Sequence, residues 1–249
     1  SQSSGHRPAD HTRGGPGRCG AANRRRNIRG IFVTAESKIC GISDAVALSA
    51  AVDGGARYVG FVFFPRSPRN VTPDEVAALT PGVPDGVTSV ALSVDPDDAL
   101  VDAINAVPGI DMFQLHGGET PKRLADIRRR TGKRVMKAFK VSAPEDLVSA
   151  EAYLEVADML LFDAKTPKEM TNALPGGNAV SFDWTILSGR DWPLPWMLSG
   201  GLDPANVGEA IDIWGGDFGL PELRQIRLAH VIRKNEYDVG ASRFRRRFR

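Results

Sequence analysis

Reactive side chains end several apolar segments of this chain, and their types suit acid–base chemistry. Cys40 ends the segment IFVTAESKIC, and Asp163 stands near the end of MLLFDA. A carboxylate that follows an apolar run into a core rarely lacks a function, and an acid held protonated there could donate a proton to a leaving oxygen. A thiol near Lys38 and a helix N-terminus could have a stabilised thiolate, which suits a base or a nucleophile. Taken alone, a cysteine at the end of a buried strand more often serves simple packing.

A second group of residues is suited to binding an anionic ligand. Arg69 follows a loop with two prolines, and a guanidinium can clamp a carboxylate through two hydrogen bonds. A solvated loop arginine is the competing interpretation. Ser199, Gly200 and Gly201 precede a helix-like segment and offer unobstructed backbone N–H groups to a phosphate. Glycine pairs also end strands for steric reasons alone.

Lys38, Gln114 and His116 are the remaining polar residues at segment ends that we assign to substrate binding. Polar groups are costly to bury without partners, so their concentration at one end of apolar segments indicates a ligand cavity. His116 could carry a proton, donate a hydrogen bond or be a core histidine with paired nitrogens. We favour binding or packing for it.

The segments that position these residues repeat along the chain with a strand-and-helix period. Their centres lie roughly 22–36 residues apart, the length of a strand plus a crossover helix, and their hydrophobicity is typical of parallel strands buried on both faces. Predicted helices begin with proline after a capping residue, as at Thr72-Pro73, and another opens at Asp44 and closes near Gly54. The predicted strands cover 31–40, 58–64, 88–94, 112–116, 135–139, 159–164 and 196–200.

Seven such units predict an α/β fold, either a closed (β/α)₈ barrel or an open doubly wound sheet. The first turn between a strand and a helix lacks GxGxxG, which disfavours the dinucleotide-binding open sheet. In a barrel, the polar segment ends would meet at one face and form the active site.

Charge divides the 249 residues into three parts. Residues 1–34 carry +6 and residues 212–249 carry +4, so the net charge of +2 leaves −8 for the middle. We predict a disordered basic N-terminal extension over 1–34, a barrel domain over 35–211 and an atypical basic C-terminal tail over 212–249. A targeting peptide is the alternative for the extension, although it has no amphipathic apolar face.

Composition and charge indicate which binding partners and which cellular compartment to expect. Basic character confined to the two ends is a weak argument for nucleic-acid binding, which needs a basic face on a folded element, so we expect no nucleic-acid partner. No run of about 18 apolar residues is present, so we expect no membrane span. Cys19 and Cys40 form no CxxC pair and no disulfide framework, which favours a reducing, cytoplasmic location.

Six motifs, in this order, resemble the phosphoribosylanthranilate isomerase family of tryptophan biosynthesis. The resemblance spans roughly residues 36–211 and implies a (β/α)₈ TIM barrel with seven recognisable βα units. The motifs are Lys38-Ile39-Cys40-Gly41-Ile42, Gly60-Phe61-Val62-Phe63-Phe64-Pro65 with Ser67-Pro68-Arg69, Gln114-Leu115-His116-Gly117, Leu161-Phe162-Asp163-Ala164-Lys165, Gly176-Gly177 with Phe182-Asp183-Trp184, and Leu198-Ser199-Gly200-Gly201-Leu202.

The resemblance implies an Amadori rearrangement that converts N-(5-phosphoribosyl)anthranilate to 1-(2-carboxyphenylamino)-1-deoxyribulose 5-phosphate. Asp163 would protonate the furanose ring oxygen, and Cys40 would remove the C2 proton from the resulting Schiff base. Arg69 would hold the anthranilate carboxylate, and Gly200 and Gly201 would form part of the phosphate site. The partner is then a phosphosugar, with no metal and no cofactor, and the protein is a monomer or a homodimer.

The resemblance stops before an eighth unit, which we expect to be missing or altered. The family's DVSSGVE-like loop is absent from the expected place, and we hypothesise an out-of-frame C-terminus. Residues 220–234 have nearly helical apolar spacing and are predicted to cover one flank as a helix without replacing the strand. An impaired barrel with an incomplete phosphate site is therefore an alternative function. A related histidine-pathway isomerase is disfavoured, since it would have aspartate in place of Cys40.

Overall fold

The computed structural model describes most of the chain between residues 26 and 231. For 26–28, 31–35 and 225–231 it describes the backbone only. The described residues are 26–28, 31–167, 170, 174, 176, 178, 180–188, 190–203, 206, 207 and 225–231.

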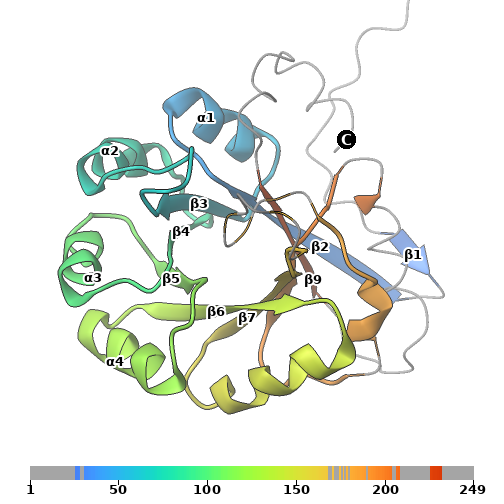
Figure 1. Cartoon of the computed structure of the whole chain (residues 1–249). Coiled ribbons are helices and arrows are strands. Elements are labelled where there is room, and N and C mark those ends of the chain that lie inside the picture. Colours follow the sequence, from blue (N-terminus) through green and yellow to red (C-terminus); the bar gives the residue numbers. More distant parts are fainter. Residues whose placement is uncertain are drawn as a thin grey trace, which may run out of the picture.

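Within this described part, eight parallel strands form a closed barrel (Figure 1). Each strand pairs with the next in chain order, and the last one pairs with both β8 and β2. The closed (β/α)₈ barrel that the family resemblance implies is confirmed, and all seven predicted strands are present. The strands are β2 (Ile31–Cys40), β3 (Tyr58–Phe63), β4 (Thr88–Ser93), β5 (Met112–Leu115), β6 (Arg134–Val141), β7 (Met159–Ala164), β8 (Trp196–Leu198) and β9 (Gln225–Val231).

The helices surround the barrel, and capping residues set where they begin (Figure 1). Asp44 and Thr72 cap the first two helices as predicted, and Thr72 forms a capping box with Glu75. The third helix begins at Asp98, because the Asp97 side chain provides the cap. The helices are α1 (Ala45–Asp53), α2 (Pro73–Leu79), α3 (Asp98–Asn105) and α4 (Pro121–Thr131), with 3₁₀ segments η1 (Thr80–Gly82), η2 (Pro144–Tyr153) and η3 (Trp184–Leu187).

Buried apolar residues form two cores, one on each side of the sheet. The larger core lies between the strands and the surrounding helices and includes Phe61, Phe113 and Ile127. The smaller one is rich in methionine. Its members are Tyr58, Val90, Met112, Met136, Ala138, Met159, Leu161 and Met197.

The smaller core fills the barrel interior. Val90, Met112 and Met197 each precede, by two residues, a side chain that lines the pocket described below. Side chains two residues apart in a strand share a face, so this core closes the floor beneath the pocket.

Residues 225–231 correct one prediction. The expected helix over 220–234 is wrong there, because Gln225–Val231 is a strand that pairs with β2 from Thr34 to Cys40 and with β8 at Leu198. Unpaired strand edges are costly, and pairing on both sides outweighs a local helical period. The eighth unit is therefore altered, with its strand present.

The predicted division into extension, barrel and tail stays a prediction. Residues 1–25, with Cys19, and residues 208–224 and 232–249 lie outside the described residues. Within the predicted extension, β1 (Arg26–Ile28) pairs antiparallel with the start of β2. No helix among the described residues is long and apolar enough to cross a membrane.

Candidate active site

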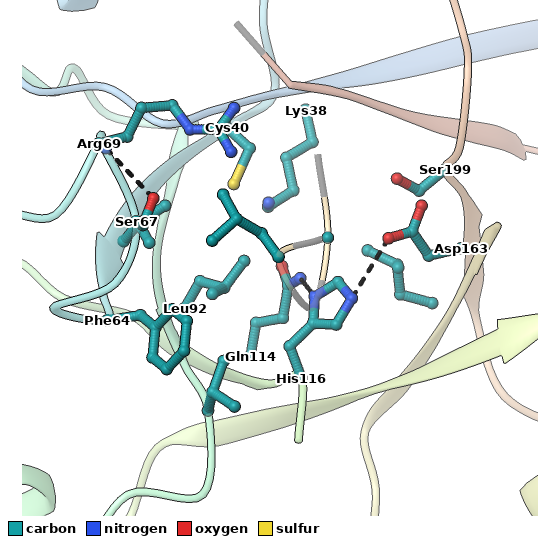
Figure 2. A pocket seen from close by; sticks show the side chains of 15 residues that line it. Lys38, Cys40, Phe64, Ser67, Arg69, Leu92, Gln114, His116, Asp163 and Ser199 are labelled. Atoms are coloured by element: carbon teal, nitrogen blue, oxygen red, sulfur yellow. Dashed lines mark hydrogen bonds and ion pairs between the residues drawn. The ribbon is translucent and has the colours of Figure 1, made fainter. Parts of the chain in front are cut away.

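A pocket opens at the carboxyl ends of the barrel strands and contains most of the predicted site residues (Figure 2). Its empty volume is about 520 Å³, part of it open to solvent. Lys38 and Cys40 on β2, and Leu161 and Asp163 on β7, stand two residues apart, which places both members of each pair on the inner face of their strand. The lining residues are Lys38, Cys40, Val62, Phe64, Ser67, Arg69, Leu92, Val94, Gln114, His116, Leu161, Asp163, Leu174, Gly176 and Ser199.

Cys40 and Lys38 share one side of the pocket, in the space that Gly60 leaves by having no side chain. Cys40 is 3% exposed and Lys38 is 1% exposed. A Cβ on Gly60 would stand 2.7 Å from the Cys40 Sγ and 3.0 Å from the Lys38 Nζ. Neither the thiol nor the ammonium has a hydrogen-bond or ion-pair partner among the described residues. A buried ammonium without a partner favours an anion beside it, either a substrate group or the thiolate.

Asp163 lies on the other side of the pocket and contacts His116 (Figure 2). The His116 Nε2 is 3.3 Å from the Asp163 Oδ2, and the Asp163 Oδ1 accepts a hydrogen bond of 3.0 Å from the Ala164 N–H. The His116 Nδ1 lies 3.1 Å from the Gln114 Nε2. A Cβ on Gly176 would stand 2.9 Å from the His116 ring, so the backbone packs against this pair. Gly177 lies outside the described residues.

Arg69 reaches the pocket from the loop after β3 and lies over Gly41. Gly41 has a φ of +95°, and a Cβ there would stand 2.5 Å from the Arg69 Cδ. The loop is held by the buried Ser67, whose Oγ accepts a hydrogen bond of 3.2 Å from the Arg69 N–H. The proline-containing loop therefore fixes the arginine backbone beside Cys40, as the sequence predicted.

Ser199, Gly200 and Gly201 form a tight turn after β8. Gly200 and Gly201 have φ values of +93° and +65°, a region that favours glycine. A Cβ on Gly200 would stand 2.6 Å from the Ala164 N. Among the described residues, no acceptor takes the N–H of Gly200 or Gly201. Two backbone donors at the pocket rim are therefore available to an anion.

A buried ion pair behind the pocket was missed by sequence reasoning. Lys137 lies on the outer face of β6, and its Nζ is 3.0 Å from the Glu119 Oε2 and 2.8 Å from the Gly117 carbonyl oxygen. The Glu119 carboxylate also accepts hydrogen bonds from the Gly117 and Asp95 N–H groups. Burial and the negative charge of Glu119 raise the pKa of Tyr153. This network holds the loop after His116 against the loop after β4.

The structure brings the predicted site residues together at one barrel mouth. Sequence reasoning missed the apolar lining, although alternate inward positions on the strands could have revealed it. No three His, Cys, Asp or Glu side chains in the described part of the chain are grouped as metal ligands. Seven predicted residues line the pocket, and Gly200 and Gly201 adjoin it. The seven are Lys38, Cys40, Arg69, Gln114, His116, Asp163 and Ser199.

Comparison with known proteins agrees with this arrangement. A family model described as N-(5'phosphoribosyl)anthranilate (PRA) isomerase matches residues 37–219. The chain belongs to this family. The N-(5'-phosphoribosyl)anthranilate isomerase of Paramagnetospirillum magneticum is 59% identical over 180 residues, which cover 72% of this chain and 83% of the relative.

Solved structures of the family share the fold. Phosphoribosyl anthranilate isomerase from Thermotoga maritima has a TM-score of 0.65 and 31% identity, covering 79% of this chain and 88% of its own. A phosphoribosyl anthranilate isomerase in complex with reduced 1-(o-carboxyphenylamino)-1-deoxyribulose 5-phosphate has a TM-score of 0.63 and 29% identity, covering 79% and 87%. Both structures support the closed barrel.

Proposed function

We propose that this protein isomerises N-(5-phosphoribosyl)anthranilate to 1-(2-carboxyphenylamino)-1-deoxyribulose 5-phosphate in tryptophan biosynthesis. The observation that carries the proposal is the placement of Cys40 and Asp163 on opposite sides of one pocket (Figure 2). Family membership and the related structure that holds a reduced form of this product support the choice of substrate. The reaction needs one acid and one base, and the pocket supplies both.

Asp163 acts first, as the general acid. Its protonated carboxyl group gives a proton to the furanose ring oxygen, and the bond between that oxygen and C1 breaks as the anthranilate nitrogen supplies an electron pair. The product of this step is an open-chain protonated Schiff base. The hydrogen bond from the Ala164 N–H to the Asp163 Oδ1 suits the carboxylate that remains.

Cys40 acts second, as the general base. Its thiolate removes the proton from C2, and the electrons of that C–H bond neutralise the iminium nitrogen to give an enolamine. A proton then moves from the C2 hydroxyl to C1, and the aminoketone forms. The ammonium of Lys38 lies in the same gap over Gly60, where it balances the negative charge of the thiolate or binds a sugar oxygen.

The substrate carries a carboxylate and a phosphate, and these two groups bind in different parts of the pocket. Arg69 holds the anthranilate carboxylate, with Phe64 and Leu92 near it as an apolar surface for the ring. The N–H groups of Gly200 and Gly201, with Ser199, bind the phosphate. Gln114 and His116 complete the wall that faces the sugar. The enzyme then needs no metal or cofactor and works as a cytoplasmic monomer or homodimer.

The closed barrel bears on the impaired-barrel alternative. That alternative assumes a missing or altered eighth unit with an incomplete phosphate site, and the strand of that unit, β9, is present and pairs with both β2 and β8. No observation specifically favours it.

Genetic complementation tests the proposed function. The chain is expressed in a tryptophan auxotroph that lacks this isomerase, beside Cys40→Ala and Asp163→Asn. We expect growth with the unsubstituted chain and loss of growth with either variant. Absence of growth with the unsubstituted protein present and folded would overturn the proposal and favour an impaired barrel.

A further inference from the structure

Gln114, His116 and Asp163 form a row of contacts along one wall of the pocket (Figure 2). All three are buried, with exposed fractions of 1%, 5% and 4%. The Gln114 Nε2 is 3.1 Å from the His116 Nδ1, and the His116 Nε2 is 3.3 Å from the Asp163 Oδ2. The imidazole therefore lies between an amide and the acid that the proposed reaction uses.

The amide determines which imidazole nitrogen carries the proton. The Gln114 Nε2 is a donor, so the His116 Nδ1 facing it must be the acceptor of that hydrogen bond. In a neutral imidazole the proton then sits on Nε2, the nitrogen that faces Asp163. Nε2 is close enough to Oδ2 for an ion pair, but its N–H is not yet aligned for a hydrogen bond. Such contacts often tighten when substrate binds.

We propose that Gln114 and His116 are positioning residues for Asp163 and do not mainly bind the substrate. Gln114 fixes the Nε2–H tautomer of His116, and this Nε2 lies 3.3 Å from the Asp163 Oδ2. This inference rests on the proposed function, because it assigns the pair a task in the acid step. It replaces the substrate-binding role predicted for both residues from the sequence.

The surroundings of the carboxyl group support a positioning role. The Ala164 N–H donates to Oδ1, so a second donor at Oδ2 would hold both oxygens. Contacts at both oxygens would fix the orientation of the carboxyl group relative to the ring oxygen, which is what a positioning role requires. The Gly176 backbone covers the contact, since a Cβ there would stand 3.0 Å from Oδ2 and 3.1 Å from Nε2. Covering the pair excludes water that would compete for these hydrogen bonds.

Nitrogen-15 NMR of the substrate-free protein tests the tautomer directly. The chain has four histidines, so the His116 signals can be assigned by their loss in His116→Gln. We expect the neutral Nε2–H form in the unsubstituted protein and a mixture of tautomers in Gln114→Leu. A dominant Nδ1–H form or an imidazolium at neutral pH in the unsubstituted protein would overturn the proposal. This measurement needs no enzymatic activity, so it stands apart from a failure of the proposed function.

Steady-state kinetics then separates positioning from substrate binding. Gln114→Leu and His116→Gln should each lower kcat about 10- to 100-fold, the range found when an outer partner of a functional group is lost, with KM changed less than about threefold. A raised KM with kcat retained would show that the residues bind substrate and would overturn the proposal.

Ser93→Ala is the matched control for loss of a buried polar group at the same barrel mouth. Ser93 is fully buried on β4, its Oγ has no hydrogen-bond partner in the described part of the chain, and it does not line the pocket. The control should keep the kcat of the unsubstituted protein. A loss in Ser93→Ala equal to that in Gln114→Leu would show that the loss is structural and would contradict the positioning role.

Discussion

The two sides of the pocket hold their reactive groups by different means. On the base side, Cys40 and Lys38 fit into the gap over Gly60, and neither has a hydrogen-bond partner among the described residues. On the acid side, a hydrogen bond from the Ala164 N–H and a close contact with the His116 Nε2 hold Asp163. Packing places the base, and polar contacts place the acid. Added volume should therefore damage one side, and loss of a donor should damage the other.

The largest expected effect comes from removing the acid or the base itself. Asp163→Asn and Cys40→Ala should each lower kcat about 10³-fold, within the range attributed to general acid–base catalysis. KM and the midpoint of urea unfolding should change little, since neither substitution adds volume. Steady-state kinetics and urea unfolding measure both. If either variant keeps more than a tenth of the original kcat, its assigned role is wrong and the two sides are not a matched pair.

Filling the gap on the base side should have the next largest effect. Gly60→Ala places a Cβ 2.7 Å from the Cys40 Sγ, so the thiol or the strand must move. We expect kcat to fall about 10-fold or more and the free energy of unfolding to fall by about 1–3 kcal/mol, as overpacking predicts.

Gly118→Ala is the control for the effect of volume. Gly118 lies at the same barrel mouth, and among the described residues a Cβ added to it would meet only the Asp95 Oδ1, at 3.7 Å. It should keep both kcat and stability. Equal losses in the two alanine variants would show that the base side is not especially sensitive to volume.

Arg69 offers a test of substrate binding next to the base. Arg69→Lys keeps the charge but loses the planar pair of donors, so KM should rise about tenfold while kcat changes less than about threefold. Steady-state kinetics with N-(5-phosphoribosyl)anthranilate measures the changes in KM and kcat separately. A fall in kcat at unchanged KM would mean that Arg69 positions Cys40 and does not bind the carboxylate. Arg69 lies over Gly41, the residue after Cys40.

The sequence predicted the strands and the place of the polar residues at one barrel mouth, because buried parallel strands are continuous apolar runs and polar residues at their ends are conspicuous. Cys40, Asp163 and Arg69 could be placed at one barrel mouth from that pattern alone. The strand Gln225–Val231 could not, since its apolar spacing is nearly helical and its pairing with β2 is a property of the closed barrel. The ion pair of Glu119 with Lys137 could not be predicted either, because the two residues come from different βα units.

The smallest expected effect concerns a hydrogen-bonded link just outside the acid side. Asp146 accepts hydrogen bonds from the Lys165 ammonium, two residues after Asp163, and from the Ser142 N–H and hydroxyl. Burial acts to raise the pKa of Asp146, but these hydrogen bonds outweigh it and lower the pKa to about 2, from an ordinary value of 3.8. Folding therefore favours the ionised carboxylate. The stability that it contributes is present above pH 3.8 and is lost as the pH falls towards about 2.

Asp146→Asn removes the charge but keeps an oxygen acceptor, so it should lower the free energy of unfolding at pH 7 by about 1 kcal/mol, the upper range for a partly exposed ion pair such as that with Lys165. The difference from the unsubstituted protein should shrink as the pH falls from about 3.8 to about 2. Urea unfolding at a series of pH values measures it, with Glu145→Gln as the control, because Glu145 is an exposed neighbouring acid in the same first turn. A difference that stays constant with pH would mean that the Asp146 charge does not contribute. The contact between Asp146 and Lys165 would then contribute through packing alone. The polar contacts that hold the acid side would be limited to those of His116 and Ala164.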